Sequence, residues 1–212
     1  MERIVVVDYS LGNLRSVSKA VEHVAPDAEV VVTDDALAIH DADRVVFPGQ
    51  GAARDCMAAI GDHHVERAVR EAAASKPFLG ICMGLQVLMD SSEENGGTDL
   101  LGMIPGRVQR FSGEHVGDNG LPLKIPHMGW SQVEQQIDHP LWHGIADHSR
   151  FYFVHSYFVV PEASGVVAAT TEYGESFVCA IARDNLFAVQ FHPEKSAADG
   201  LRLLKNFVEW KP

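Results

Sequence analysis

The sequence has few basic residues and few cysteines, and each shortage argues against a class of protein. It carries 17 Lys and Arg against 29 Asp and Glu, which gives a formal net charge of −12. Nucleic acids and anionic membranes attract clustered Lys and Arg, so this balance argues against both as main partners. The three cysteines, Cys56, Cys82 and Cys179, are odd in number and far apart in the chain. This spacing argues against a disulfide framework.

Long apolar runs are also missing. The longest mostly apolar stretch, residues 151–160, is too short to span a bilayer as a helix. The first ten residues lack the basic start and the apolar region of a secretory signal, so we expect a cytoplasmic protein. The 212 residues contain no internal repeat and no obvious linker. They predict one domain over residues 1–212, which buries roughly 70% of the surface of the unfolded chain.

Short apolar segments alternate with helical patterns in the first half of the chain. Residues 4–7 form a continuous apolar run, as expected of a buried parallel strand. The alternation predicts an α/β fold with a mainly parallel central sheet and helices on both faces. Glycine-rich turns interrupt residues 91–127, which we expect to form an excursion at the sheet edge. The predicted strands are residues 4–7, 29–32, 45–47, 77–81, 130–134, 151–160, 166–171, 177–182 and 186–191.

Cys82 stands between the predicted strand 77–81 and a helical pattern that includes Leu85. Gly80 and Gly84 flank it, as in a nucleophile elbow with cysteine in place of serine. A sharp strand-to-helix turn forces unusual backbone angles, and side chains at its flanks would collide with neighbouring elements. The helix amino terminus would also stabilise a thiolate. The alternative interpretation is a buried free cysteine that acts as a small hydrophobic residue.

A nucleophilic cysteine needs a base and a group that orients the base. His192 directly follows the predicted strand 186–191, at the carboxyl end where sites of open α/β sheets lie. Glu194 comes two residues later. The pattern predicts a triad of Cys82 as nucleophile, His192 as general base and acid, and Glu194 as the orienting carboxylate. Ser196 follows, and it resembles the start of a capping box for the last helix.

Two other interpretations of this histidine remain open. His192 could be a polar surface residue in a loop after a strand. His-x-Glu also supplies two of the three ligands of a non-haem iron site, although such oxygenases favour an antiparallel barrel and this chain begins strand-helix-strand. We therefore expect no metal. Cys56 and Cys179 occur in apolar helix and strand patterns, and we expect both in the core.

Three motifs together resemble the triad-type class I glutamine amidotransferases: Pro-Gly-Gln-Gly at 48–51, Gly-Ile-Cys-Met-Gly-Leu-Gln at 80–86 and Phe-His-Pro-Glu at 191–194. Further segments at 126–130, 152–157 and 194–196 are similar to the glutaminase subunits of imidazole glycerol phosphate synthase. The resemblance implies a flavodoxin-like, three-layer fold without a cofactor. It also implies a heterodimer in which L-glutamine is hydrolysed and ammonia passes to a cyclase subunit for histidine biosynthesis. Ser10-Leu11 departs from the glycine-containing pair of many relatives.

The same resemblance assigns roles to individual residues. It places the oxyanion donors at the backbone N–H groups of Gln50 and Met83, and it implies that the Gly49–Gln50 peptide rotates as a switch. Trp130 and Lys195 match positions that face the cyclase. Trp130 could instead be a core residue, and Gln86 an ordinary exposed helix residue. The positions that match substrate contacts are Gly51, Gln86, Glu94, His155, Ser156 and Tyr157.

Two rival functions fit the same motifs. The chain could be the glutaminase subunit of another amidotransferase, for anthranilate or pyridoxal phosphate synthesis, although the His-Met-Gly-Trp segment at 127–130 disfavours this. It could also be a binding module that keeps the fold without turnover. The intact set of Cys82, His192 and Glu194 argues against that interpretation, because a binding module would tolerate the loss of any one of them.

Overall fold

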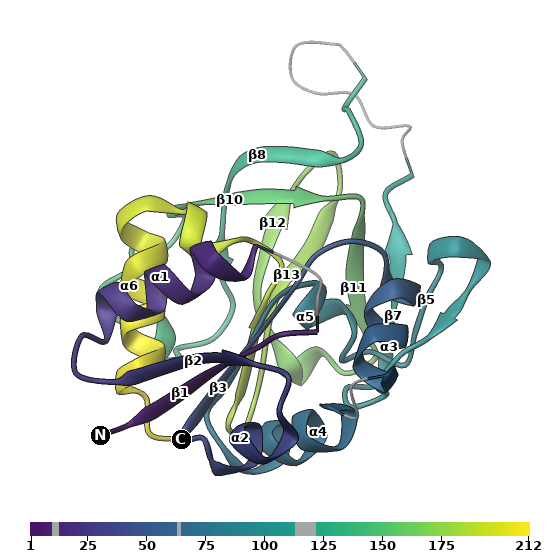
Figure 1. Ribbon diagram of the computed structural model, residues 1–212. Helices are drawn as coiled ribbons and strands as arrows, with labels where there is room; N and C mark the ends of the chain where they lie inside the picture. The colour runs from purple at the N-terminus through teal and green to yellow at the C-terminus, as the bar shows by residue number, and fades with distance from the viewer. Residues whose placement is uncertain (10–12, 63–64, 113–121) are drawn as a thin grey trace.

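The amino-terminal half alternates strands and helices, as the sequence predicted (Figure 1). The computed structural model describes residues 1–9, 13–62, 65–112 and 122–212. The Ser10-Leu11 pair lies outside the described residues. The elements of this half are β1 (Arg3–Val7), α1 (Leu14–Val24), β2 (Glu29–Thr33), α2 (Ala36–Asp41), β3 (Arg44–Gly49), α3 (Ala53–Asp62), α4 (Val65–Ser75), β4 (Phe78–Cys82) and α5 (Met83–Gln86).

The second half is dominated by short strands and ends in a long helix. Three of these strands fall within residues 91–127, where an edge excursion was expected. The elements are β5 (Ser91–Ser92), β6 (Thr98–Asp99), β7 (Gly106–Arg110), β8 (His127–Gln132), β9 (Glu134–Gln135), β10 (Arg150–His155), β11 (Tyr157–Pro161), β12 (Val167–Glu172), β13 (Ser176–Arg183), β14 (Leu186–Val189) and α6 (Ala197–Glu209).

The main sheet has the strand order β2-β1-β3-β4-β14-β13-β11-β7-β5-β6. The pairings from β2 to β14 are all parallel, whereas β13, β11 and β7 are joined by antiparallel pairings. β5 and β6 form the far edge, which confirms the predicted excursion. The fold is therefore mixed α/β, with a mainly parallel centre and an antiparallel edge.

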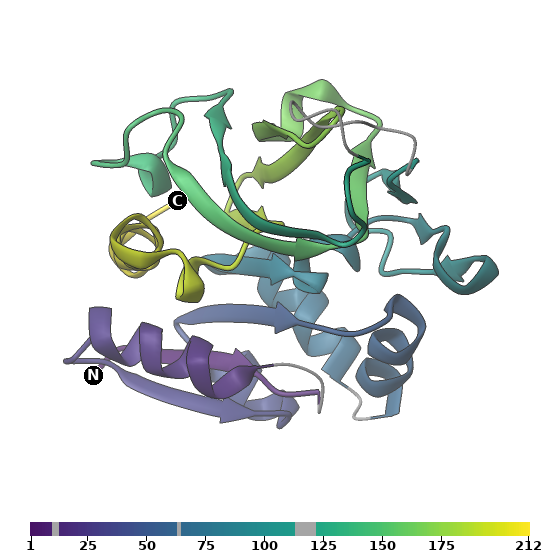
Figure 2. The same cartoon turned by 90° about the horizontal axis from the view of Figure 1, so that it is seen from above.

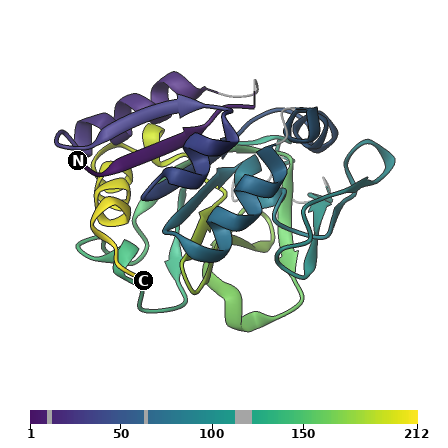
Figure 3. The same cartoon turned by 60° about the horizontal axis from the view of Figure 1, so that its bottom comes forward.

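Both faces of the parallel part are covered, and each cover has its own apolar core. Along β1, Ile4 and Val6 pack with residues of α1 and α6, whereas Val5 and Val7 pack with residues of α2, α3 and α4. Successive strand residues point to opposite faces, so a strand buried on both faces has a continuous apolar run. Figure 3 shows α4 in front of the sheet, with α1 and α6 on the other side.

A separate antiparallel pair, β8 and β10, crosses above the carboxyl ends of the central strands (Figures 1 and 2). The prediction of one strand over residues 151–160 is therefore wrong. The strand is interrupted at Ser156. β10 before it pairs with β8, while β11 after it pairs with β7 and β13 in the main sheet. The imidazole Nδ1 of His155 bonds the Tyr157 carbonyl across this break (2.8 Å).

One local prediction about a helix start also needs correction. The predicted capping box at Ser196 is wrong, because its side chain makes no bond to the start of α6. Its hydroxyl instead donates to the His192 carbonyl (2.6 Å) and accepts from the Tyr152 backbone N–H (3.0 Å). Among the described residues, no helix combines the length and the apolar character needed to cross a membrane.

Candidate active site

Cys82 is the last residue of β4 and the residue before α5, as the elbow motif predicted. Its backbone has φ 57° and ψ −107°, a conformation that residues other than glycine rarely adopt. The flanking glycines are required by close packing. A Cβ on Gly84 would lie 1.9 Å from the Phe47 carbonyl oxygen, and one on Gly80 would lie 2.8 Å from the Gly84 oxygen. The strained backbone angles are thus those of the cysteine itself. The two glycines allow the turn to pack closely against β3.

His192 follows β14, the parallel neighbour of β4, so that histidine and cysteine leave adjacent strand ends. Its Nδ1 lies 2.9 Å from Oε1 of Glu194, and both side chains are buried. Its Nε2 is buried and has no hydrogen-bond partner in the described part of the chain. Nδ1 is therefore held by the carboxylate while Nε2 remains available, which is the arrangement a general base requires.

The charges around His192 favour its protonated form. Burial lowers the pKa of this imidazole, but the nearby negative charge of Cys82 and the hydrogen-bonded carboxylate of Glu194 outweigh burial and raise the pKa to about 10. The buried site therefore favours an imidazolium next to the sulfur of Cys82. Such a pair can attack a carbonyl carbon and then protonate a leaving amine.

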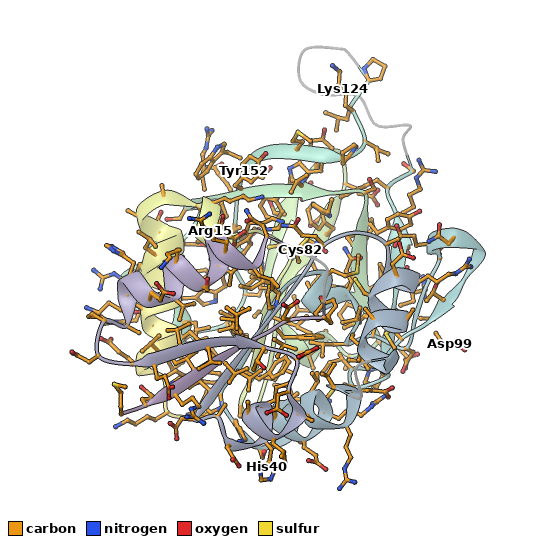
Figure 4. The ribbon with its side chains drawn as sticks, viewed as in Figure 1. Arg15, His40, Cys82, Asp99, Lys124 and Tyr152 are labelled. Atoms are coloured by element: carbon orange, nitrogen blue, oxygen red, sulfur yellow. The ribbon has the colours of Figure 1, made fainter. Side chains whose placement is uncertain are left out.

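A cavity of about 400 Å³ opens beside Cys82 and His192. Figure 4 shows Cys82 near the middle of the molecule, below the strand that carries Tyr152. Glu194 is not in the cavity wall; it lies behind His192. The wall brings together the residues that were predicted for oxyanion and substrate contacts, and Lys195: Gln50, Gly51, Met83, Gln86, Glu94, His155, Ser156, Tyr157 and Lys195.

The segment after β3 is held close to the cysteine. Gly49 lies opposite Cys82 in the β3–β4 register, and a Cβ on it would lie 2.0 Å from the Tyr9 hydroxyl. That hydroxyl donates to the Pro48 carbonyl (2.6 Å), and the Cys56 thiol donates to the Gln50 carbonyl (3.4 Å). Burial raises the pKa of Cys56 to about 12, so the thiol keeps its proton and can donate. Cys56 and Cys179 are free and buried, which confirms the core assignment.

The family described as "Glutamine amidotransferase class-I" matches residues 5–210 of the chain. The chain belongs to this family. The amidotransferase is 60% identical to "Imidazole glycerol phosphate synthase subunit HisH" of Thiobacillus denitrificans over 99% of this chain and 92% of that protein. It is 55% identical to the subunit of the same name from Nitrosomonas europaea, over the full length of both.

Two solved structures share the fold of the amidotransferase at low sequence identity. "Structure of PurLQS from Thermotoga maritima" superposes with a TM-score of 0.72 at 18% identity and covers 98% of both chains. A glutamine amidotransferase of the same organism superposes with a TM-score of 0.61 at 17% identity, over 98% of this chain and 81% of that one. The predicted fold class is confirmed.

Two alternatives for single residues of the amidotransferase are wrong. Gln86 is not an exposed helix residue, because it is buried and its Nε2 bonds the Tyr157 carbonyl (3.0 Å). Trp130 is not a core residue, because 47% of it is exposed on β8, beside the exposed Met128. Lys195 lies in the cavity wall.

Glu94 of the amidotransferase does more than line the cavity. Its carboxylate accepts a hydrogen bond from the Ala53 N–H at the start of α3 (2.7 Å). The carboxylate therefore fixes the start of that helix, where negative charge is favourable.

The sequence analysis missed one buried polar residue beside Cys82. Gln190 is fully buried, and its Nε2 lies 3.7 Å from Sγ of Cys82. The signal was present in the sequence, because a glutamine within the apolar run 186–191 is unusual for a strand buried on both faces.

Proposed function

We propose that this chain is the glutaminase subunit of an imidazole glycerol phosphate synthase. It hydrolyses L-glutamine to L-glutamate and ammonia and delivers the ammonia to a cyclase subunit in histidine biosynthesis. The observation that carries the proposal is that Cys82 and His192 line one cavity, with Glu194 bonded to His192, in a chain 55% identical, end to end, to a subunit of that name. The chain acts in the cytoplasm as a single domain over residues 1–212 and needs no cofactor or metal.

The proposed mechanism is acyl transfer through a thioester. The Cys82 thiolate attacks the side-chain amide carbon of glutamine. The C–N bond then breaks as the His192 imidazolium gives its proton to the departing ammonia. His192 next takes a proton from water, which attacks the thioester and restores the thiolate as glutamate leaves. Glu194 holds Nδ1 of His192 throughout, and its charge supports the imidazolium.

Backbone N–H groups stabilise the negative oxygen of the tetrahedral intermediate in this proposal. Met83 N–H lies at the start of α5, directly after the nucleophile. Gln50 N–H comes from the strand end opposite Cys82. Removal of one such donor typically lowers the rate by a factor of about 10² to 10³. The Gly49–Gln50 peptide acts as the switch that aims the second donor.

Replacement of Cys82 with alanine tests the reaction. We expect glutamine hydrolysis by the complex with the cyclase to fall by at least about 10⁴-fold, because nucleophile and leaving-group chemistry are lost together. The measurement is glutamate release with and without the purified cyclase and its nucleotide substrate. Alanine at Cys179, a buried cysteine that does not line the cavity, is the matched control and should keep turnover. Persistent hydrolysis by the Cys82 variant would refute the assignment.

The cyclase is proposed to dock on the face of β8 that carries Met128 and Trp130, next to the Lys195 rim of the cavity. Exposed aromatic residues of this kind contribute most to interface affinity, so Trp130→Ala should weaken cyclase binding by about 30-fold or more. Isothermal titration of the two subunits measures this effect. Leu37→Ala is the control: this leucine is 73% exposed on α2, at the opposite end of the molecule (Figure 1). An equal loss in both variants would rule out a β8 interface.

The rival functions predict other outcomes. A glutaminase subunit for anthranilate or pyridoxal phosphate synthesis would co-purify with those synthases instead of a cyclase. A binding module would bind a glutamine analogue without covalent labelling of Cys82. The relatives that carry the HisH name at 52–60% identity over 99–100% of this chain favour the cyclase pathway over both.

A further inference from the structure

Gln190 links the nucleophile to a second buried amide. Its Nε2 lies 3.7 Å from Cys82 Sγ, and its Oε1 lies 3.0 Å from Nε2 of Gln86. Both glutamines are buried, and they come from elements more than 100 residues apart in the chain. A buried amide has a defined orientation only if its partners distinguish its oxygen from its nitrogen. The question is therefore which group sets the direction of these bonds.

The Tyr157 carbonyl sets it, because a carbonyl oxygen can only accept. The Gln86 amide must turn its nitrogen toward this carbonyl, from which it lies 3.0 Å. The second N–H of that nitrogen then points at Gln190, which must present its oxygen. The nitrogen of Gln190 is left to face Cys82. The flip of both amides thus follows from one backbone group, and the remaining oxygen of Gln86 is buried without a partner in the described residues.

The same carbonyl orders two histidines on its other side. Nδ1 of His155 lies 2.8 Å from the Tyr157 oxygen, so it must carry a proton. Burial lowers the pKa of His155 to about 3, so the ring is neutral and its Nε2 accepts. Nδ1 of His127, 3.0 Å away, is therefore the donor, and Nε2 of His127 accepts from the Ser131 hydroxyl (2.9 Å). Each hydrogen bond in this series, from the Gln190 amide to the Ser131 hydroxyl, therefore has one permitted direction.

We infer that Gln190 is a catalytic residue that donates an amide N–H to Cys82 Sγ and holds the thiolate in place, in a direction fixed by the Tyr157 carbonyl. This rests on the proposed function only in taking Cys82 as the nucleophile. A donor at the sulfur stabilises the anion more than the neutral thiol, because hydrogen bonds to charged groups are the stronger ones. It also fixes the χ1 rotation of a side chain whose backbone is already strained.

The test is Gln190→Met, which keeps the volume and removes the donor. The pH midpoint of Cys82 alkylation by iodoacetamide, followed by mass spectrometry, should rise by about one pH unit, a tenfold change in thiolate population. The titratable groups that interact with Cys82 or share its cavity, among them His192, Tyr9, Cys56, Glu94, His155, Tyr157 and Lys195, are the same in the variant. Gln136→Met, at an exposed glutamine, is the matched control. An unchanged midpoint would overturn the inference.

A second variant and a second measurement guard against loss of folding. Gln190→Glu keeps the oxygen that Gln86 needs but places a carboxylate near the sulfur, so the pH midpoint of Cys82 alkylation should rise further than in Gln190→Met.

In the unmodified chain, imidazole ¹⁵N NMR should find His127 and His155 protonated at Nδ1, which is the less common neutral form of free histidine. A proton on Nε2 of either ring would contradict the assigned donors and acceptors of these hydrogen bonds.

The outcomes separate this inference from the proposed function. If the unmodified complex hydrolyses glutamine but the midpoint does not move in the Gln190 variants, the inference fails and the function stands. If the midpoint moves but the complex releases no glutamate, the donor role stands and the glutaminase assignment fails.

Discussion

Gly84→Ala is expected to destabilise the fold by about 3 kcal/mol or more and to abolish glutamine hydrolysis. The new Cβ would lie 1.9 Å from the Phe47 carbonyl oxygen, which is backbone and cannot rotate away. Relief would require α5 to move off β3. Overpacking of a tight core typically costs about 1–3 kcal/mol, and a clash with backbone in the central sheet belongs at the upper end or beyond. Chemical denaturation with a two-state fit measures the change.

Gly61→Ala provides the matched control. Gly61 lies near the end of α3, and a Cβ there meets no atom within 4 Å. Alanine favours helix by about 1 kcal/mol over glycine, so this variant should be as stable as the parent or more stable. Equal stability of the two alanine variants would mean that the approach of α5 to β3 is looser than described. Because the Met83 N–H starts that same turn, the Gly84 variant should lose activity even where it still folds.

The sequence predicted the parallel half of the fold, and the placement of Cys82 and His192 at strand ends, for physical reasons that act locally. A strand buried on both faces needs a continuous apolar run, and Ile4 to Val7 supply one. Gly80 and Gly84 at two residues on either side of Cys82 indicate close packing around a turn. His192 was assigned because it ends an apolar strand. Its convergence with Cys82 then follows from the rule that sites lie at carboxyl strand ends.

The remainder depends on partners that are far apart in the sequence. The interruption at Ser156 could not be predicted. The alternating apolar pattern of residues 151–160 would be the same if they formed one strand in one sheet or two strands in different sheets. Ser196 has a spacing typical of a helix cap, but its hydroxyl bonds the His192 carbonyl and the Tyr152 N–H, 44 residues away. The role that we propose for Gln190 depends on contacts with residues 104 and 108 positions away in the chain.

Acid should destabilise the protein steeply below pH 6.5 through two buried histidines. Burial lowers the pKa of His155 to about 3 and that of His127 to about 4, from a reference value of 6.5. Between these values the unfolded chain binds protons that the folded chain cannot, so the free energy of unfolding falls as pH falls. The stabilisation is complete above pH 6.5 and is lost toward pH 4. From pH 7 to pH 5 each histidine should contribute a loss of about 2 kcal/mol.

His127→Phe isolates one of these contributions. Phenylalanine can keep the stacking of His127 on Tyr173 (4.0 Å) and Phe153 (4.9 Å), but it cannot bind a proton. The variant should be less stable at pH 7, because it leaves Nε2 of His155 without its donor. Its further loss between pH 7 and pH 5 should nevertheless be smaller than that of the parent by about 2 kcal/mol. Urea unfolding at the two pH values measures both quantities. His23 is exposed, so His23→Phe is the control and should keep the full pH dependence of the parent. If His127→Phe also kept the full pH dependence, the His127 ring would be protonated as readily in the folded chain as in the unfolded one.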